Sequence, residues 1–460
     1  MSIVPFKDLQ KNNCLEHSAE SRVRDAEASC SSHSSPSNLE HPVRPTPADT
    51  DIEASLPSLT PAIGSRSVRW KAELRRRTLH FAPSWFSVNM GTGIVSTLLH
   101  QLPYQFSGLG VLSNVVFVLN VFLFTLFLGV SVARYALWPK VWWAMLYHPQ
   151  QSLFVGTFSM GFATIVNMLA LSCVPAWGQN FAWFVWACWW LDAALSLAIC
   201  VALPFFQFTR HVHSLDQMTG VWLLPMVTTT VASASGGIVA AVLPPAQARL
   251  TIVASYVLMG IGTPLAFLVM ALYFLRLALH KIPPAALIVS IFLPIGPCGQ
   301  GAFGLLQLSS VLRTLSRSTG QALGGTSLYT AQEARTMASA ISGVSMVMGL
   351  ILCGMGFFWL IIAVSIILDM RRCQKLPFNV SWWGFVFPLG TLASAAVSFA
   401  KEFDSGGFRI IGTTLSLAVV VLWIVVGFRT VVEAWYGKMF IAPCLGESGE
   451  PPKELPGRQY

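Results

Sequence analysis

Ten apolar runs follow one another along most of this chain, and this succession limits its possible folds more than any other feature. Each run is long enough to cross a bilayer as a helix that rises about 1.5 Å per residue. Charged residues make up 11% of the sequence, against about a quarter in soluble proteins. We therefore predict an all-α, polytopic membrane protein with about ten transmembrane helices. The runs cover residues 84–102, 108–132, 150–174, 180–206, 220–243, 250–279, 287–312, 336–368, 381–400 and 409–432.

The odd-numbered runs differ in composition from the even-numbered ones. Odd runs carry glycine, proline and small polar residues near their middles, whereas even runs such as 115–130 are mostly Leu, Val, Phe and Trp. The repeating unit is then a helical hairpin that is used five times. We expect five small-residue helices around a central axis, with five smooth helices outside them against lipid and neighbouring subunits.

One stretch in the seventh run, residues 291–303, shows the pattern most strongly. It places two prolines, three glycines and an amide near mid-membrane. Irregular backbone at that depth is tolerated against protein or a water-filled cavity, which favours a transport pathway. A kinked packing helix is the alternative. Gly91, Gly161, Pro225 and Pro388 lie at comparable depths in the other odd runs, and this repetition favours the pathway.

The middles of the odd runs contain no Lys, Arg, Asp or Glu. They offer hydroxyls, amides and the N–H groups of half-helices that begin after each break, and such a lining favours weakly held anions. The hydroxyls could instead satisfy carbonyls of their own or neighbouring helices. The candidate pore-lining residues are Asn89, Gly91, Thr92, Gly161, Thr228, Thr229, Thr230, Ser233, Gly299, Gln300 and Gly301.

Two titratable residues stand out. Asp192 lies deep in the fourth run, where an acid is functional or paired; a buried structural bond and proton coupling are the two interpretations. His148 precedes the third run and could titrate near neutral pH, either to sense pH or simply to line the inner mouth.

The ends of the chain have a different composition. Residues 1–65 are polar and rich in Ser and Pro, which predicts a disordered tail. The transport domain then covers 66–435, and 436–460 form a second tail. A basic block over 66–77 predicts cytosolic termini, with a phosphoinositide site as a further use. The net charge of +9 is therefore attributed to basic residues that set the membrane topology and contact anionic lipid, not to binding of nucleic acid.

No pattern of catalysis or metal binding is present in the sequence. The nine cysteines are scattered without a CxxC pair. Nucleotide-binding, zinc-protease and serine-hydrolase motifs are absent as well. We therefore expect neither an enzyme nor a bound cofactor or metal.

Several motifs lie along the chain: Phe81-Ala82-Pro83-Ser84-Trp85-Phe86 with Met90-Gly91-Thr92-Gly93, His148-Pro149 followed by Ser152-Leu153-Phe154-Val155-Gly156-Thr157, Gly296-Pro297-Cys298-Gly299-Gln300-Gly301, and Trp382-Trp383 with Phe387-Pro388. Together they resemble the tellurite-resistance/dicarboxylate transporter superfamily, which includes slow anion channels and malate permeases. The resemblance covers about residues 78–435. Within the superfamily the sequence is most similar to the fungal branch that exports sulfite.

The resemblance implies five hairpins with pseudo-fivefold symmetry around a central pore, in a subunit of a homotrimer. It also implies a phenylalanine gate in the ninth helix, which corresponds to Phe387, with Phe385 as the competitor. Core packing is the structural alternative for this ring. The implied function is plasma-membrane efflux of sulfite or bisulfite; a malate permease or a slow anion channel of the same fold is the alternative.

Overall fold

The computed structural model describes residues 66–323 and 329–445, and within them every regular element is a helix. The tail predicted over 1–65 lies outside the described residues, as do residues 446–460 of the second predicted tail. From Arg75 onward the chain belongs to one helical unit. The expectation of an all-α protein is therefore confirmed.

The helices fall into three groups along the chain. One group is α3 (Phe86–Gln101), α6 (Gly156–Met168), α9 (Leu224–Ala240), α11 (Ile295–Thr319) and α13 (Val386–Glu402). A second is α4 (Leu109–Leu137), α8 (Gln179–Thr209), α10 (Pro245–His280), α12 (Ala331–Cys373) and α14 (Gly406–Trp435). The connecting elements are α2 (Arg66–Leu79), α5 (Pro139–Tyr147), the π-helix η3 (Leu169–Cys173), α7 (Val174–Trp177), η4 (Leu215–Gln217) and η8 (Pro443–Leu445).

Nine helical segments among the described residues are long and apolar enough to cross a membrane. They correspond to the second to tenth predicted spans. The first predicted span contains α3, which has 16 residues and is shorter than the roughly 20 that a straight crossing needs. A short 3-10 segment, η1 (Pro83–Trp85), precedes α3 directly.

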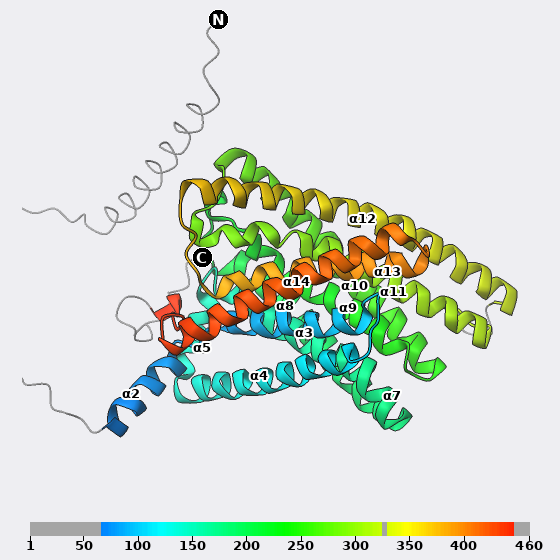
Figure 1. Ribbon diagram of the computed structural model, residues 1–460, viewed down its shortest axis with the longest axis horizontal. Coiled ribbons are helices and arrows are strands. Elements are labelled where there is room, and N and C mark those ends of the chain that lie inside the picture. Colours follow the sequence, from blue (N-terminus) through cyan, green and yellow to red (C-terminus); the bar gives the residue numbers. More distant parts are fainter. Residues whose placement is uncertain (1–65, 324–328, 446–460) are drawn as a thin grey trace, which may run out of the picture. The chain divides into compact units, whose positions relative to one another are not determined.

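Burial separates the first group from the second. Between 72% and 100% of the apolar window is buried in the spans that contain α6, α9, α11 and α13, and α3 is buried from Phe86 to Leu99. In the second group the share is 22% to 33%. Figure 1 shows α4 and α12 along opposite edges of the helical unit with α3 between them. We call the two groups the inner and the outer helices.

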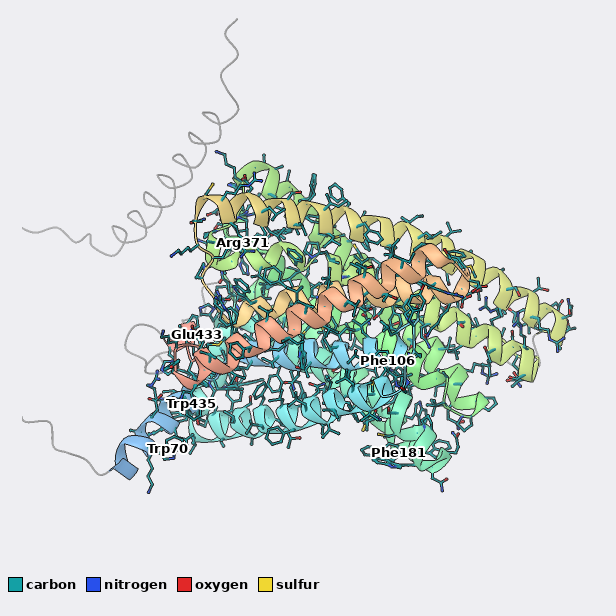
Figure 2. All side chains as sticks on the ribbon, viewed as in Figure 1. Trp70, Phe106, Phe181, Arg371, Glu433 and Trp435 are labelled. Carbon is teal, nitrogen blue, oxygen red and sulfur yellow. The ribbon has the colours of Figure 1, made fainter. Side chains whose placement is uncertain are left out.

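Outer helices present large apolar side chains at their surface. Trp435, near the end of α14, is labelled in Figure 2 and is 80% exposed. Exposed apolar area on this scale in a water-soluble protein would mark an interaction site, and in a membrane-spanning helix it meets lipid.

The inner helices form a closed ring of contacts. Helix α3 packs against α6, α6 against α9, α9 against α11, α11 against α13, and α13 returns to α3. Each inner helix also packs against the outer helix that follows it: α3 on α4, α6 on α8, α9 on α10, α11 on α12 and α13 on α14.

Every inner helix begins with a 3-10 segment. In addition to η1 these are η2 (Ser152–Val155), η5 (Gly220–Leu223), η6 (Ala285–Phe292) and η7 (Val380–Phe385). Neighbouring segments touch, so that the five 3-10 segments close a second ring. A 3-10 turn is common where an α-helix starts, because it tightens the first backbone hydrogen bonds.

The breaks predicted at mid-membrane lie elsewhere. Helices α3 and α6 continue without interruption through Gly91 and Gly161. The irregular point of the seventh span is at Pro294, directly before α11, so Gly299 to Gly301 lie within α11 and do not start it. Glycine at these places serves close packing. Irregular backbone occurs where each inner helix starts, and also in the π-helix η3 directly after α6.

Candidate functional site

A cavity of about 370 Å³ lies where the five inner helices begin. Each of the five 3-10 segments contributes to its wall, and so does the first turn of each inner helix. The first N–H groups of a helix carry partial positive charge and lack partners within the helix. Five helix starts around one cavity therefore create a weakly electropositive environment. We call this cavity the inner vestibule.

Specific contacts hold the ring of 3-10 segments together around the vestibule. Thr157 donates a hydrogen bond to the Pro83 carbonyl at 3.1 Å, which joins η1 to the start of α6. Asn379 donates to the Ala286 carbonyl at 3.1 Å, between η7 and η6. A methyl group at Gly220 would overlap the carbonyl oxygen of Ser290, so glycine is what lets η5 approach η6.

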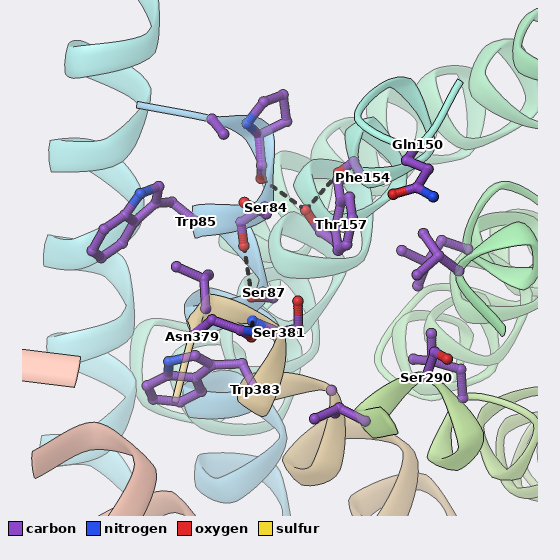
Figure 3. Close-up of a pocket in the computed structure, with 18 of the residues that line it drawn as sticks. Ser84, Trp85, Ser87, Gln150, Phe154, Thr157, Ser290, Asn379, Ser381 and Trp383 are labelled. Carbon is purple, nitrogen blue, oxygen red and sulfur yellow. Dashed lines mark hydrogen bonds between the residues drawn. The ribbon is translucent and has the colours of Figure 1, made fainter. Parts of the chain in front are cut away.

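Hydroxyl groups recur around the vestibule at equivalent places. Figure 3 shows Ser84, Thr157 and Ser381 on one side of the cavity and Gln150 and Ser290 on the other. The sequence reasoning missed these serines. A repeated signal was available: Ser, one apolar residue and Phe follow one another at 84–86, 152–154 and 290–292. The hydroxyl-bearing residues within or directly before the lining segments are Ser84, Thr219, Ser290 and Ser381.

His148 lines the same vestibule. Its Nδ1 accepts hydrogen bonds from the backbone N–H groups of Gln150 and Gln151, both at 3.2 Å. Burial lowers the pKa of His148 below its usual value, and nearby His211 acts in the same direction. The imidazole is therefore neutral at neutral pH, with Nδ1 occupied and Nε2 as its N–H donor.

The charged groups in the vestibule wall balance each other. Glu433 and Lys438 both contribute to the wall, and their charged atoms lie 3.9 Å apart. With His148 neutral, the wall carries no net charge. Its attraction for an anion then comes from helix starts, hydroxyls and amides, which bind weakly.

The two candidate gate residues lie in different environments. Phe387, in the first turn of α13, lines the vestibule and is 3% exposed. Phe385 ends η7 and lies outside the vestibule wall. The centre of its ring is 4.8 Å from that of Phe292 and 5.5 Å from that of Trp382. Only Phe387 of the two therefore borders the cavity.

Most of the predicted lining hydroxyls face neighbouring helices instead. Thr228 donates to the carbonyls of Pro225 and Ser196. Ser233 donates to the Ser255 carbonyl at 2.6 Å. Thr229 donates to the Met226 carbonyl, and Thr230 shares a hydrogen bond with Thr263. None of the four borders the vestibule. These hydroxyls therefore bond to carbonyls and hydroxyls of their own and neighbouring helices, as the alternative interpretation of them expects.

The polar residues of α3 likewise bond to outer helices. Thr92 accepts a hydrogen bond from the indole of Trp423 in α14 at 3.1 Å. Asn89 donates to Asn120 in α4 at 3.1 Å. Both residues are buried, and these bonds fix α3 against the outer helices on either side of it.

The predicted glycines permit close approach between helices. A methyl group at Gly299 would lie 2.5 Å from the backbone nitrogen of Leu392, so α11 and α13 meet backbone to backbone there. At Gly91 it would meet Trp383, at Gly161 it would meet Asn89, and at Gly301 it would meet Leu352. Gln300 is buried one helical turn beyond Gly296, which lines the vestibule.

Asp192 is fully buried on outer helix α8 and reaches inner helix α6. Ser159 donates to its Oδ1 at 3.0 Å, and the Ser159 hydroxyl also contacts the hydroxyl of Ser196. Asp192 borders neither of the two cavities described here. These contacts favour the structural interpretation of this acid.

A second cavity, of about 790 Å³, lies at the other ends of inner helices α3 and α13. His100 and Gln101 at the end of α3, Gln307 in α11 and Lys401 at the end of α13 contribute to its wall. Since the inner helices all start at the vestibule, the two cavities mark opposite ends of the ring. We call the second one the outer cavity.

No cluster of His, Cys, Asp and Glu arranged to hold a metal ion occurs within residues 66–323 and 329–445. Both cavities are instead bordered by neutral polar groups, apolar side chains and a few charges. The arrangement can receive a small solute at either end of the ring and lacks, in the described residues, the group of ligands that metal-dependent chemistry would require.

Comparisons with known proteins identify the family of this chain. The family described as voltage-dependent anion channel (SLAC1) matches residues 80–431. The sulfite efflux pump of Arthroderma otae is 45% identical over 78% of this chain and 92% of its own length. That of Trichophyton rubrum is 44% identical, with the same coverage. A malic acid transport protein of Schizosaccharomyces pombe is 24% identical over 82% of this chain and 84% of its own.

These matches confirm the resemblance to the superfamily of slow anion channels and malate permeases, and with it the expectation of a membrane transporter and not an enzyme. The matched residues span all five inner helices and all the residues that border the outer cavity. The chain therefore belongs to the voltage-dependent anion channel (SLAC1) family of multi-pass membrane transport proteins.

Proposed function

We propose that this chain exports sulfite or bisulfite from the cytosol across the plasma membrane, through a pathway inside each subunit. The observation that carries the proposal is the neutral, hydroxyl-lined vestibule at the start of five inner helices. Relatives that are 44% to 45% identical over 92% of their length are named sulfite efflux pumps, which supports the choice of anion.

In the proposed architecture the chain crosses the membrane ten times, as five hairpins with pseudo-fivefold symmetry around a central pore. The segment η1 with α3 supplies the first crossing over residues 83–101, and each inner helix pairs with the outer helix after it. The closed rings of helices and of 3-10 segments support this arrangement. The transport domain is residues 66–435.

The vestibule opens to the cytosol in this proposal, and both termini are cytosolic. Basic residues border the vestibule end of the outer helices, as the bias toward positive cytosolic loops predicts. Arg134 lies near the end of α4, and Arg371 and Arg372 near the end of α12. A homotrimer is proposed from the family resemblance, with the outer helices facing lipid and the other subunits.

The proposed gate is the Phe387 ring; Phe385, the other candidate, packs against Phe292 and Trp382 instead. Phe387 lies between the vestibule and the rest of the ring, where a phenyl group obstructs and dewets a narrow path. An anion would be held at the vestibule by helix starts and hydroxyls, and would pass when the ring moves. Of the other predicted lining residues, Gln300 and the glycines Gly91, Gly161, Gly299 and Gly301 are proposed to shape the path beyond the gate.

The remaining site candidates are proposed to have structural roles. Asn89, Thr92, Thr228, Thr229, Thr230 and Ser233 would hold inner helices to their neighbours. Asp192 would join α6 to α8 without coupling protons to transport, and His148 would act as a neutral donor in the vestibule wall and not as a pH sensor. Their hydrogen bonds support each assignment.

A transport assay tests the proposal. The chain is reconstituted in liposomes loaded with sulfite or malate, and release of each anion is followed against protein-free liposomes. We expect sulfite release to exceed malate release by about tenfold, a barrier difference of about 1.4 kcal/mol. Faster malate release would favour the alternative, a dicarboxylate permease, which the similarity to a malic acid transport protein supports. Release of neither anion would contradict both.

A further inference from the structure

The outer cavity lies at the C-terminal ends of inner helices, and this creates an electrostatic problem for a leaving anion. The last carbonyl groups of a helix carry partial negative charge, the reverse of the helix start. The cavity is bordered by the ends of α3 and α13. An anion attracted to the vestibule would therefore be repelled where it emerges, unless side chains offset the helix ends.

Lys401 is placed to provide that offset. It lies in the last turn of α13 and borders the outer cavity. Along α13 it continues the face that begins at Phe387, through Thr391, Ser394 and Ser398, with spacings of four, three, four and three residues. Phe387 borders the vestibule and Lys401 borders the outer cavity, so one face of one helix connects the proposed gate to the lysine.

The acidic residues nearest in sequence to Lys401 are already paired with other cations. Arg313 binds the carboxylate of Glu402 at 2.7 Å. Arg409 forms an ion pair with Asp404, and both residues of this pair border the outer cavity. Among the described residues no carboxylate forms an ion pair with Lys401, whose positive charge therefore faces the cavity without a neutralising partner.

His100 adds a polar side chain to the site from the neighbouring helix. It lies in the last turn of α3 and borders the same cavity. A lysine at a helix end can serve only to stabilise the helix, through its interaction with the helix dipole. That role needs no cavity and no alignment with Phe387, whereas Lys401 has both.

We infer that the outer cavity is an anion-binding site, in which Lys401, assisted by His100, receives a small oxoanion that has passed Phe387. The inference rests on the proposed anion transport. The site makes the pathway asymmetric: neutral donors collect the anion at the vestibule, and at the exit Lys401, which has no ion-pair partner among the described residues, offsets the helix ends. Binding stays weak enough for release because the cavity is open to solvent and its charge is screened by salt.

Charge substitution tests the inference in the reconstituted full chain. At low ionic strength Lys401→Gln should slow sulfite release by about three- to tenfold, the effect of one partly screened charge a few ångströms from the anion. The difference should shrink at high ionic strength, and Lys401→Arg should keep the wild-type rate. Arg317→Gln is the matched control, because Arg317 lies in the last turn of α11 but does not border the cavity.

A second measurement gives the same folded variant, Lys401→Cys, either a positive or a negative charge by chemical modification. In cells that express Lys401→Cys, an external cationic methanethiosulfonate should restore sulfite export, and an anionic one should lower it further. Arg317→Cys should respond to neither reagent. Lys401→Gln with the wild-type rate at low ionic strength, or equal effects of both reagents on Lys401→Cys, would overturn the inference. Failure of the wild-type chain to release sulfite would instead contradict the proposed function.

Discussion

The inner and outer helices solve different problems with similar apolar sequences. Outer helices of 29 to 43 residues face their surroundings with large side chains, and about a quarter to a third of each apolar window is buried. Inner helices are shorter, and each starts with a 3-10 segment. They pack closely against one another through small residues. Hydrophobicity alone therefore identifies a crossing, while small residues and early turns identify which crossings form the ring.

The largest effect should come from adding one methyl group to an inner helix. Gly299→Ala places a carbon 2.5 Å from the backbone of Leu392, and overpacking of this kind costs about 1–3 kcal/mol or more. We expect a clear fall in the thermal unfolding temperature of the purified protein.

The matched change lies on an outer helix. A methyl group at Gly354 in α12 meets no atom within 4 Å, so Gly354→Ala should be neutral or stabilise α12 by about 0.5–1 kcal/mol. Equal destabilisation by the two variants would break the distinction between inner and outer helices.

A smaller effect is expected where an inner helix is bonded to an outer one. Asp192→Asn retains an oxygen that can accept from Ser159, so the free energy of unfolding should fall by about 1 kcal/mol. The pH dependence of sulfite release should be unchanged, because the proposed role of Asp192 is structural. A shifted pH profile in well-folded protein would restore the proton-coupling interpretation.

The sequence predicted the crossings well because a bilayer imposes a minimum apolar length, and it separated odd from even runs by their small residues. It misplaced the irregular backbone: the presence of Gly91 and Gly161 does not break α3 or α6, since neighbouring helices compensate for a weak helix former. Proline was more informative, because Pro294 lies at the actual junction between η6 and α11.

The site was harder to predict, because the direction of a side chain around an inner helix depends on which neighbours pack against it. Thr228 and Ser233 have the composition expected of a pore lining but bond to neighbouring carbonyls. The serines of the 3-10 segments were missed, although Ser, an apolar residue and Phe recur there, because so short a pattern lacks the helical periodicity that marks a lining face. Phe387 was separable from Phe385 only once the vestibule was visible.

The most direct test of the account is sulfite flux through Phe387→Ala, measured in liposomes at matched protein amounts. Removing the ring should raise flux by about tenfold, which corresponds to about 1.4 kcal/mol of barrier. Phe385→Ala, which removes aromatic packing outside the vestibule wall, should lower stability without a comparable rise in flux. Unchanged or lower flux in well-folded Phe387→Ala protein would contradict a pathway gated by this residue.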